Sequence, residues 1–172
     1  KLEEIDAISV SRGPGSYTGL RIGVSTAKGL CFSLSRPLIA IDTLKSIAAS
    51  GLKKSLENEW GKNIKENSKL LFCPMIDARR MEVYSAIYDL DLKLIRGVQA
   101  DIVGPSSYSD YLGENQVVFF GDGMNKCQEY LGQHKNAIFL DGIFPTSKEM
   151  VLLSEKAFKE QDFQDLAYFE PF

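Results

Sequence analysis

Apolar residues recur along this chain with two periods, one typical of α-helices and one typical of β-strands. Short apolar or alternating runs predict strands at Ile5–Val10, Pro37–Ile41, Lys69–Ile76, Arg80–Leu90, Val117–Phe120 and Ala137–Leu140, with Leu92–Ile95 and Gln99–Val103 extending a meander. Helical spacing predicts helices at Gly19–Leu34, from Asp42 or Thr43 through Leu52, at Ser106–Leu112, at Met124–Leu131 and from Thr146 to about Gln161. This order of elements predicts two α/β lobes in succession.

A polar and charged segment, Glu57–Lys69, is the best candidate linker in the chain. It predicts a first lobe at residues 1–68 and a second lobe at residues 69–145. Residues 146–172 would form a last helix, opened by a capping box at Thr146–Glu149, and an aromatic tail that returns to the first lobe. The first lobe has only two predicted parallel strands, which leaves a sheet edge open. We therefore expect that further strands precede Lys1.

Composition narrows the classes of function. The chain has 172 residues and a net charge of −3, which argues against broad, charge-driven binding to bare nucleic acid. It contains no apolar run of about 18 residues, so no transmembrane helix is predicted. The three cysteines, Cys31, Cys73 and Cys127, are scattered, which favours reduced thiols in a cytoplasmic protein.

A glycine-rich segment, Ser11–Gly23, lies between the first predicted strand and the first predicted helix. Glycines and the free N–H groups of a helix start can together hold an anion. However, the phosphate-loop motif needs a lysine that this segment lacks, and the dinucleotide motif needs a glycine where Thr18 stands. Gly19, Gly23 and Ala27 recur every four residues, a stripe that favours close packing of another helix, within the chain or across a dimer.

Few residues could carry catalysis. His134 is the single histidine, so a zinc site with two histidines cannot be assembled from this sequence. Cys127 and His134 have the spacing of a pair two helical turns apart, but no carboxylate is visible that would orient either one. Two incidental residues are the better interpretation. We therefore predict no catalytic residue and no metal site in this chain.

Asp77, Arg79 and Glu82 form another polar cluster, and Gly121–Gly123 (GDG) follows a predicted buried strand. One interpretation is a hairpin in which Asp77 accepts backbone N–H groups and Arg79 pairs with a carboxylate of the next strand, with GDG as an ordinary turn. The other is a ligand cleft, because ligands bind beyond the carboxyl ends of strands in open α/β sheets. The candidate nucleotide or cleft contacts are Asp77, Arg79, Glu82, Gly121, Asp122 and Gly123.

Three stretches resemble the glycoprotease-like family. They are RGPGSYTGLRIG at Arg12–Gly23 with AKGL at Ala27–Leu30, IDARRMEVY at Ile76–Tyr84 and, more loosely, the tail Tyr168–Phe172. The resemblance runs from about Asp6 to Gly123, and the last fifty residues match only in layout. It implies an α/β fold of the two-lobed actin-like ATPase (ribonuclease H-like) class. The first lobe would be truncated, because the family's first strand, hairpin and helix would precede Lys1.

The resemblance also implies a function. The non-catalytic members lack the metal-binding histidine pair of their catalytic relatives, so this chain would be a scaffold that activates a TsaD-type catalytic subunit, together with a TsaE-type ATPase. The complex transfers a threonylcarbamoyl group to adenosine-37 of tRNA. The chain would meet tRNA only through the complex, with ATP or ADP at an interface, and would form a homodimer when alone. The partner-binding candidates are Arg12, Gly13, Pro14, Gly15, Ser16, Tyr17, Thr18, Gly19, Arg21, Ile22, Gly23 and Ala27.

Two other functions stay open on the sequence. A small-molecule kinase or ATPase of the actin-like class would need Gly13–Gly19, Asp77 and Gly121–Gly123 to converge on one nucleotide cleft. A metallopeptidase is the least favoured function, since the sequence offers the family label and no metal-binding chemistry.

Overall fold

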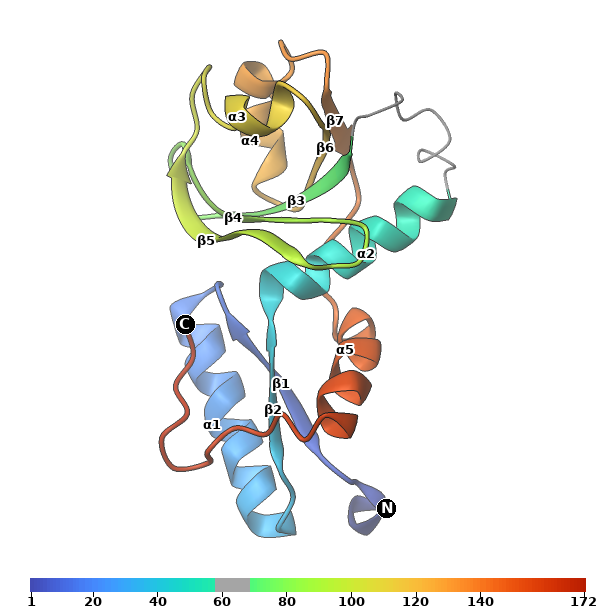
Figure 1. The fold of residues 1–172 in the computed structure, drawn as a ribbon. Helices are drawn as coiled ribbons and strands as arrows, with labels where there is room; N and C mark the ends of the chain where they lie inside the picture. The colour runs from blue at the N-terminus through green and yellow to red at the C-terminus, as the bar shows by residue number, and fades with distance from the viewer. Residues whose placement is uncertain (58–68) are drawn as a thin grey trace. The chain divides into compact units, whose positions relative to one another are not determined.

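The computed structural model describes residues 1–57 and 69–172, and these residues form two compact units (Figure 1). Unit 1 combines Lys1–Ser46 with Thr146–Phe172, and unit 2 is the continuous stretch Ile47–Pro145. The predicted linker lies almost entirely outside the described residues. Unit 1 has a sheet of two strands and unit 2 a sheet of five.

Unit 1 is a parallel sheet with one helix on each face. Its elements are a 3-10 turn at Leu2–Glu4, β1 at Ile8–Gly13, α1 at Tyr17–Leu34, β2 at Leu38–Asp42, the first residues of α2 at Thr43–Glu57, and α5 at Ser147–Lys159. Side chains alternate between the two faces of a strand. In β2, Leu38 therefore packs with α1. Ile39 and Ile41 point to the opposite face and pack with α5.

The C-terminal tail closes the core of unit 1 on the side of α1. Its start pairs with β2, where the Gln164 N–H donates to the Leu38 carbonyl oxygen at 2.8 Å, and its end reaches β1, where the Phe172 N–H donates to the Arg12 carbonyl oxygen at 2.6 Å. Between these points Leu166 and Phe169 pack on the α1 face of the sheet. The α1 face of unit 1 is therefore completed by residues from the far end of the chain.

Unit 2 is a mixed sheet with the strand order β5-β4-β3-β6-β7. Its strands are β3 at Leu70–Asp77, β4 at Glu82–Tyr88, β5 at Leu94–Ile102, β6 at Gln116–Phe120 and β7 at Ala137–Leu140. β3, β4 and β5 form an antiparallel meander, and β6 and β7 continue the sheet in parallel with β3. The remaining helices are α3 at Ser109–Leu112 and α4 at Met124–Leu131.

Helices cover both faces of the unit 2 sheet. On one face Cys73, Met75 and Phe119 pack with residues of α3 and α4 in the main hydrophobic cluster. On the other face α2 lies so close to the sheet that a Cβ at Gly51 would overlap the ring of Phe120. Glycine permits this close approach of a helix to a sheet.

The predicted elements are present, but several differ from the prediction in extent or detail, such as α3, which begins at Ser109 and not at Ser106. The predicted strand Ile5–Val10 is shifted to β1, because pairing with β2 extends as far as Gly13. The two short strands predicted around Gly97 are one strand, β5, which has register shifts against β4. The predicted capping box of α5 is wrong, since the Thr146 side chain makes no capping hydrogen bond.

Candidate functional site

The glycine-rich segment begins inside unit 1. Gly13 is buried and has a φ of +109°, a conformation that favours glycine. A Cβ at this position would lie 2.9 Å from the Cβ of Phe172 and 3.3 Å from its carbonyl oxygen. Pro14 is also buried. Gly13 is therefore required by the close approach of the chain's own tail, and neither residue is exposed for a partner to contact.

The next residues form the exposed start of α1. Ser16 caps the helix, and its Oγ accepts the Gly19 N–H at 3.3 Å. This bond satisfies one of the N–H groups that a helix start leaves free. The remaining exposed candidates in this stretch are Gly15, Tyr17, Thr18, Arg21 and Ile22. Arg12 precedes them at the end of β1, where its Nε lies 2.5 Å from Asp42.

Two of the three small residues of the stripe, Gly23 and Ala27, face the sheet of unit 1 and no helix of the described chain, whereas Gly19 is exposed. Ala27 is buried against the sheet, and a Cβ at Gly23 would lie 3.7 Å from Val10 of β1. A Cβ at Gly19 would have only Ser16 within 4 Å among the residues that the structure describes beyond its chain neighbours and the helix backbone. The prediction that this stripe packs on another helix within the chain is therefore wrong, because the turn of α1 points Gly23 and Ala27 at the strands.

The opposite side of α1 exposes apolar residues around a different glycine. Ile22 is 63% exposed and Phe32 is 82% exposed. No described residue outside the helix backbone and the neighbours of Gly29 lies within 4 Å of the position that a Cβ on Gly29 would occupy. We call Ile22, Gly29 and Phe32 the outer face of α1. Gly29 and Phe32 were not among the predicted partner-binding residues, because the four-residue spacing of Gly19, Gly23 and Ala27 follows another side of the helix.

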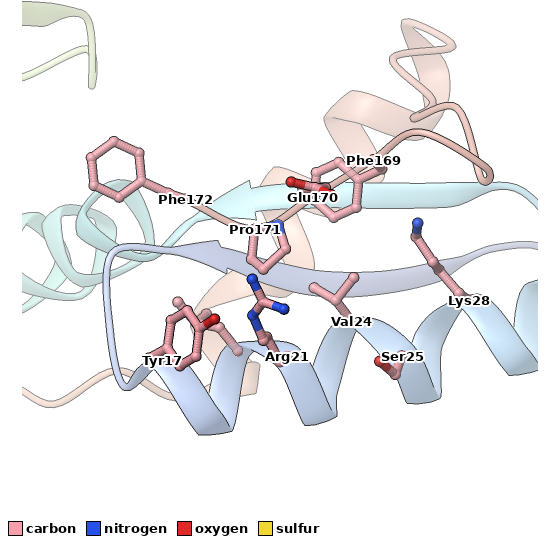
Figure 2. A pocket seen from close by; sticks show the side chains of 10 residues that line it. Tyr17, Arg21, Val24, Ser25, Lys28, Phe169, Glu170, Pro171 and Phe172 are labelled. Carbon is pink, nitrogen blue, oxygen red and sulfur yellow. The ribbon is translucent and has the colours of Figure 1, made fainter.

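A groove of about 310 Å³ runs along one flank of α1, between the helix and the tail (Figure 2). It is lined by Tyr17, Leu20, Arg21, Val24, Ser25, Lys28, Phe169, Glu170, Pro171 and Phe172. The guanidinium of Arg21 lies 4.5 Å from the centre of the Tyr17 ring, a cation–π contact. Lys28 Nζ donates to the Ala167 carbonyl oxygen at 3.3 Å, which ties the tail to the helix.

The groove combines two cations, one carboxylate and aromatic walls. Tyr17 and Arg21 were predicted site residues. Lys28 was not among the predicted site residues, because no contact was assigned to it. The tail residues Phe169 and Phe172 were not predicted either, because they are far from the glycine-rich segment in the sequence. Such a surface fits an apolar segment that carries a charged side chain.

The cluster at Asp77 is a closed hairpin turn. Its Oδ1 accepts the Arg79 N–H at 2.6 Å and lies 2.6 Å from Nζ of Lys126, which also donates to the Glu82 carbonyl oxygen at 2.6 Å. The hydrogen bond from Lys126, and then that from the Arg79 N–H, lowers the pKa of the Asp77 carboxyl. The predicted backbone acceptor role of Asp77 is confirmed. The predicted ion pair of Arg79 is wrong, since the cation beside this carboxylate is Lys126, from α4.

The Gly121–Gly123 loop is folded onto the end of β3. Gly121 has a φ of +101°, and a Cβ there would overlap the Met75 carbonyl oxygen. A Cβ on Gly123 would lie 2.9 Å from Val83 Cγ1. Asp122 Oδ1 accepts the Asp77 N–H at 3.1 Å. The structure thus brings the two predicted clusters together at the carboxyl ends of β3 and β6, where close packing explains both glycines.

The groups weighed for catalysis lie apart. α4 ends at Leu131, so His134 is not on the same helix as Cys127, and its Nε2 instead lies 3.1 Å from the Pro105 carbonyl oxygen. Burial raises the pKa of Cys127 to about 11. Within residues 1–57 and 69–172, no group of three histidine, cysteine or acidic side chains is placed to hold a metal ion. None of the described helices is long and apolar enough to cross a membrane.

A polar network under the β4–β5 hairpin has no signal in the pattern of the sequence. Asp101 pairs with Arg96 and accepts hydrogen bonds from the hydroxyls of Ser85 at 2.6 Å and Tyr108 at 2.9 Å. Burial opposes ionisation of Asp101, but the bonds from Arg96, Ser85 and Tyr108 outweigh it, so the pKa of the carboxyl is lowered. Burial raises the pKa of Tyr108, which keeps its hydroxyl as a donor.

A family model described as TsaD, tRNA N6-adenosine threonylcarbamoyltransferase, matches residues 1–168. Two similar curated proteins are both called tRNA threonylcarbamoyladenosine biosynthesis protein TsaB. The one from Bacillus subtilis is 36% identical over 99 residues, and the one from Escherichia coli is 28% identical over 176 residues. The matches cover 58% and 99% of this chain, but the chain spans only 37% and 71% of the lengths of these relatives.

Solved structures show the same fold. A Pseudomonas aeruginosa protein, described as uncharacterised with similarity to peptidase YeaZ, matches with a TM-score of 0.75 and 22% identity. The match covers 100% of this chain and 74% of that protein. A structure described as YeaZ from the same species matches with a TM-score of 0.73. The predicted α/β fold of the actin-like, ribonuclease H-like class is confirmed.

Proposed function

The chain belongs to the family whose model is described as TsaD, tRNA N6-adenosine threonylcarbamoyltransferase, and on that premise we propose that it is a non-catalytic scaffold of a complex that forms threonylcarbamoyladenosine in tRNA. Its curated relatives from B. subtilis and E. coli are named for the biosynthesis of this nucleoside. The scaffold would bind a TsaD-type catalytic subunit and hold it in its active shape. In this role the chain needs a docking surface and no catalytic groups of its own.

The outer face of α1 carries this proposal. Exposed large apolar side chains on both sides of an open glycine let a second helix approach closely and bury them. Ile22 and Phe32 are that pair of side chains, and no side chain of the described residues fills the space above Gly29. The exposed start of α1, from Gly15 to Ile22, would continue the contact, and the groove beside Tyr17 and Arg21 would receive a side segment of the partner.

The state of the reactive groups supports the non-catalytic role. Asp77 is held by Lys126, Cys127 is buried, and the ring of His134 faces a backbone carbonyl. A catalytic acid, base or nucleophile needs access to substrate and a partner that activates it. These residues lack that arrangement in the described part of the chain.

The other members of the complex follow from the same proposal. A TsaE-type ATPase would join the pair, ATP or ADP would bind at an interface, and tRNA would be held by the assembly. Without its partner the chain would form a homodimer in the cytoplasm through the outer face of α1, since exposed apolar surface of this kind is buried by self-association.

The test replaces both apolar residues of the outer face. Ile22→Glu with Phe32→Glu places two charges in the proposed interface, so we expect affinity for the TsaD-type protein of the same organism to fall at least about a hundredfold. Titration calorimetry and sedimentation would measure this. Leu152→Glu is the matched control, because Leu152 is 76% exposed on the other helix of unit 1.

Undiminished affinity of the double variant would refute this assignment of the interface. Gly23→Leu is a poorer test, although the glycine stripe first pointed to it. Gly23 faces Val10, so a leucine there would disturb the packing of α1 on its own sheet. A loss of affinity for the TsaD-type protein could then result from disturbed packing within unit 1 and would not identify the interface.

A further inference from the structure

The turn between β3 and β4 presents two adjacent arginines on a rigid support. Arg79 and Arg80 are exposed, and both have positive φ angles, of 72° and 46°. Such angles are uncommon for residues other than glycine, but tight hairpin turns use them. No ion pair or hydrogen bond joins either guanidinium to the described residues, unlike Arg12, Arg96 and Lys126, which are each paired with a carboxylate.

The turn is fixed from three sides. Within it, the Glu82 N–H donates to the Arg79 carbonyl oxygen at 3.0 Å and the Ala78 N–H donates to the Glu82 carbonyl oxygen at 3.1 Å. Lys126 holds it from α4, and the Val103 N–H donates to the Met81 carbonyl oxygen at 3.0 Å from the end of β5. A rigid backbone lowers the entropy lost when its side chains bind.

A hollow of about 510 Å³ lies at this turn. It is lined by Ala78, Arg79, Arg80, Met81, Glu82 and Ile102. Ile102 is 80% exposed, so the hollow has one apolar wall beside two cationic residues and one acidic residue, Glu82.

We propose that Arg79 and Arg80 contact consecutive phosphates of the substrate tRNA, so that this chain itself positions the RNA in the complex. The proposal rests on the proposed function. A planar guanidinium binds a phosphate through two parallel hydrogen bonds, and an RNA strand offers closely spaced phosphates to two neighbouring arginines. Contacts to phosphates position an RNA without reading its sequence.

The net charge explains why this contact acts inside a complex. The whole chain carries a charge of −3, so its general field does not attract RNA. A local pair of unpaired cations adds affinity once another subunit has bound the tRNA. An acidic segment of a protein partner is the competing occupant. If it binds here, replacing the arginines would weaken the affinity for a protein subunit.

The test uses the assembled complex with Arg79→Gln and Arg80→Gln together. We expect the dissociation constant for unmodified tRNA to rise about tenfold and the slope of log affinity against log salt to become shallower by about 1.5 to 2. Fluorescence anisotropy over a salt series measures both. Arg79→Lys with Arg80→Lys should restore most of the slope, because the charges return. Lys93→Gln with Lys135→Gln is the matched control at exposed lysines elsewhere in unit 2.

Three outcomes would overturn the proposal. The first is an unchanged affinity and salt slope, and the second is a loss that the lysine variant does not restore at all. The third is a loss of affinity for a protein subunit in calorimetry, which would assign the turn to an acidic protein segment.

Failure of the proposed function is detected separately. If the unaltered chain does not assemble with a TsaD-type protein, the same variants are compared as isolated chains with tRNA at about 20 mM salt, where weak phosphate contacts are strongest. Equal binding of the variants and the unaltered chain there would also overturn the arginine proposal.

Discussion

Individual charged residues in this protein are used mainly to hold backbone segments in place. Asp101 and Arg96 are mostly enclosed under the β4–β5 hairpin, next to the register shifts between these strands. The ion pair is joined by two hydroxyl groups, so every oxygen of the Asp101 carboxylate has a donor. Such a network, with each member satisfied, fixes one register among the several that a bulged hairpin could adopt.

Asp101→Asn tests this network. It leaves Arg96 enclosed without its counter-ion, and we expect it to reduce the free energy of unfolding by about 3 kcal/mol near pH 7. Because the pKa of Asp101 is lowered in the folded state, its ionised form stabilises the fold above the unfolded pKa of about 3.9, and this contribution is lost as the pH falls through the folded pKa.

The difference between the variant and the unaltered protein should therefore begin to shrink as the pH falls below about 4, and it should shrink further as the pH passes through the lower, folded pKa. Urea unfolding followed by circular dichroism measures it at each pH. Asp110→Asn, at an exposed position of α3, is the control and should change stability little at any pH. A penalty that stays constant down to low pH would show that the charge of Asp101 is not the cause.

At the scale of elements, α1 has three different sides. One side packs on the sheet through buried residues such as Ala27 and Cys31, a flank lines the groove under the tail, and the outer face is exposed. The helix begins at the Ser16 cap and ends at Ser35, which has a left-handed conformation. α5 begins without a side-chain cap even though its sequence has the capping-box pattern.

The two helix starts give a paired prediction. Ser16→Ala removes a capping bond and should lower the free energy of unfolding by about 1 kcal/mol, whereas Thr146→Ala removes none and should lower it by less than about 0.5 kcal/mol. Urea unfolding of both variants under one condition decides the comparison. Equal losses at the two positions would contradict the assignment of the caps.

At the scale of the whole molecule, the two units are built differently along the chain. Unit 2 is one continuous stretch with its own hydrophobic cluster. Unit 1 needs residues from both ends, since α5 covers one face of its sheet and the tail closes the other. Unit 2 is therefore the part that can fold from local sequence, whereas unit 1 depends on contacts between distant segments.

Ending the chain at Pro145 tests this difference. The truncated protein loses α5 and the tail, so β1, β2 and α1 should lose their protection against hydrogen exchange, while β3 to β7 keep theirs. Exchange monitored by mass spectrometry reports each segment separately. Uniform loss of protection in both units would show that unit 2 does not fold without unit 1.

Much of the fold could be predicted because it follows from local periodicity. The pattern of apolar residues correctly predicts the strand Val117–Phe120 and the helix Met124–Leu131. It does so because the spacing of apolar residues along the chain shows whether one face or both faces of an element are buried. The extent of β1 and the single strand β5 differ from the prediction, because a pairing partner decides where a strand ends.

The site was predicted in part. Tyr17, Arg21 and Ile22 are exposed on or beside α1, but Gly29, Phe32 and Lys28 were not chosen.

The sequence by itself determined the elements, their order, the family resemblance and the glycines that the turns require. It determined these because helix and strand periods and turn chemistry are local properties of the chain. Only the tertiary structure decided which side of α1 is free, that Phe172 covers Gly13, and that Lys126 is the cation beside Asp77. Each of these depends on packing between segments far apart in the chain, and a stripe of small residues looks the same in sequence whether it faces its own sheet or a partner.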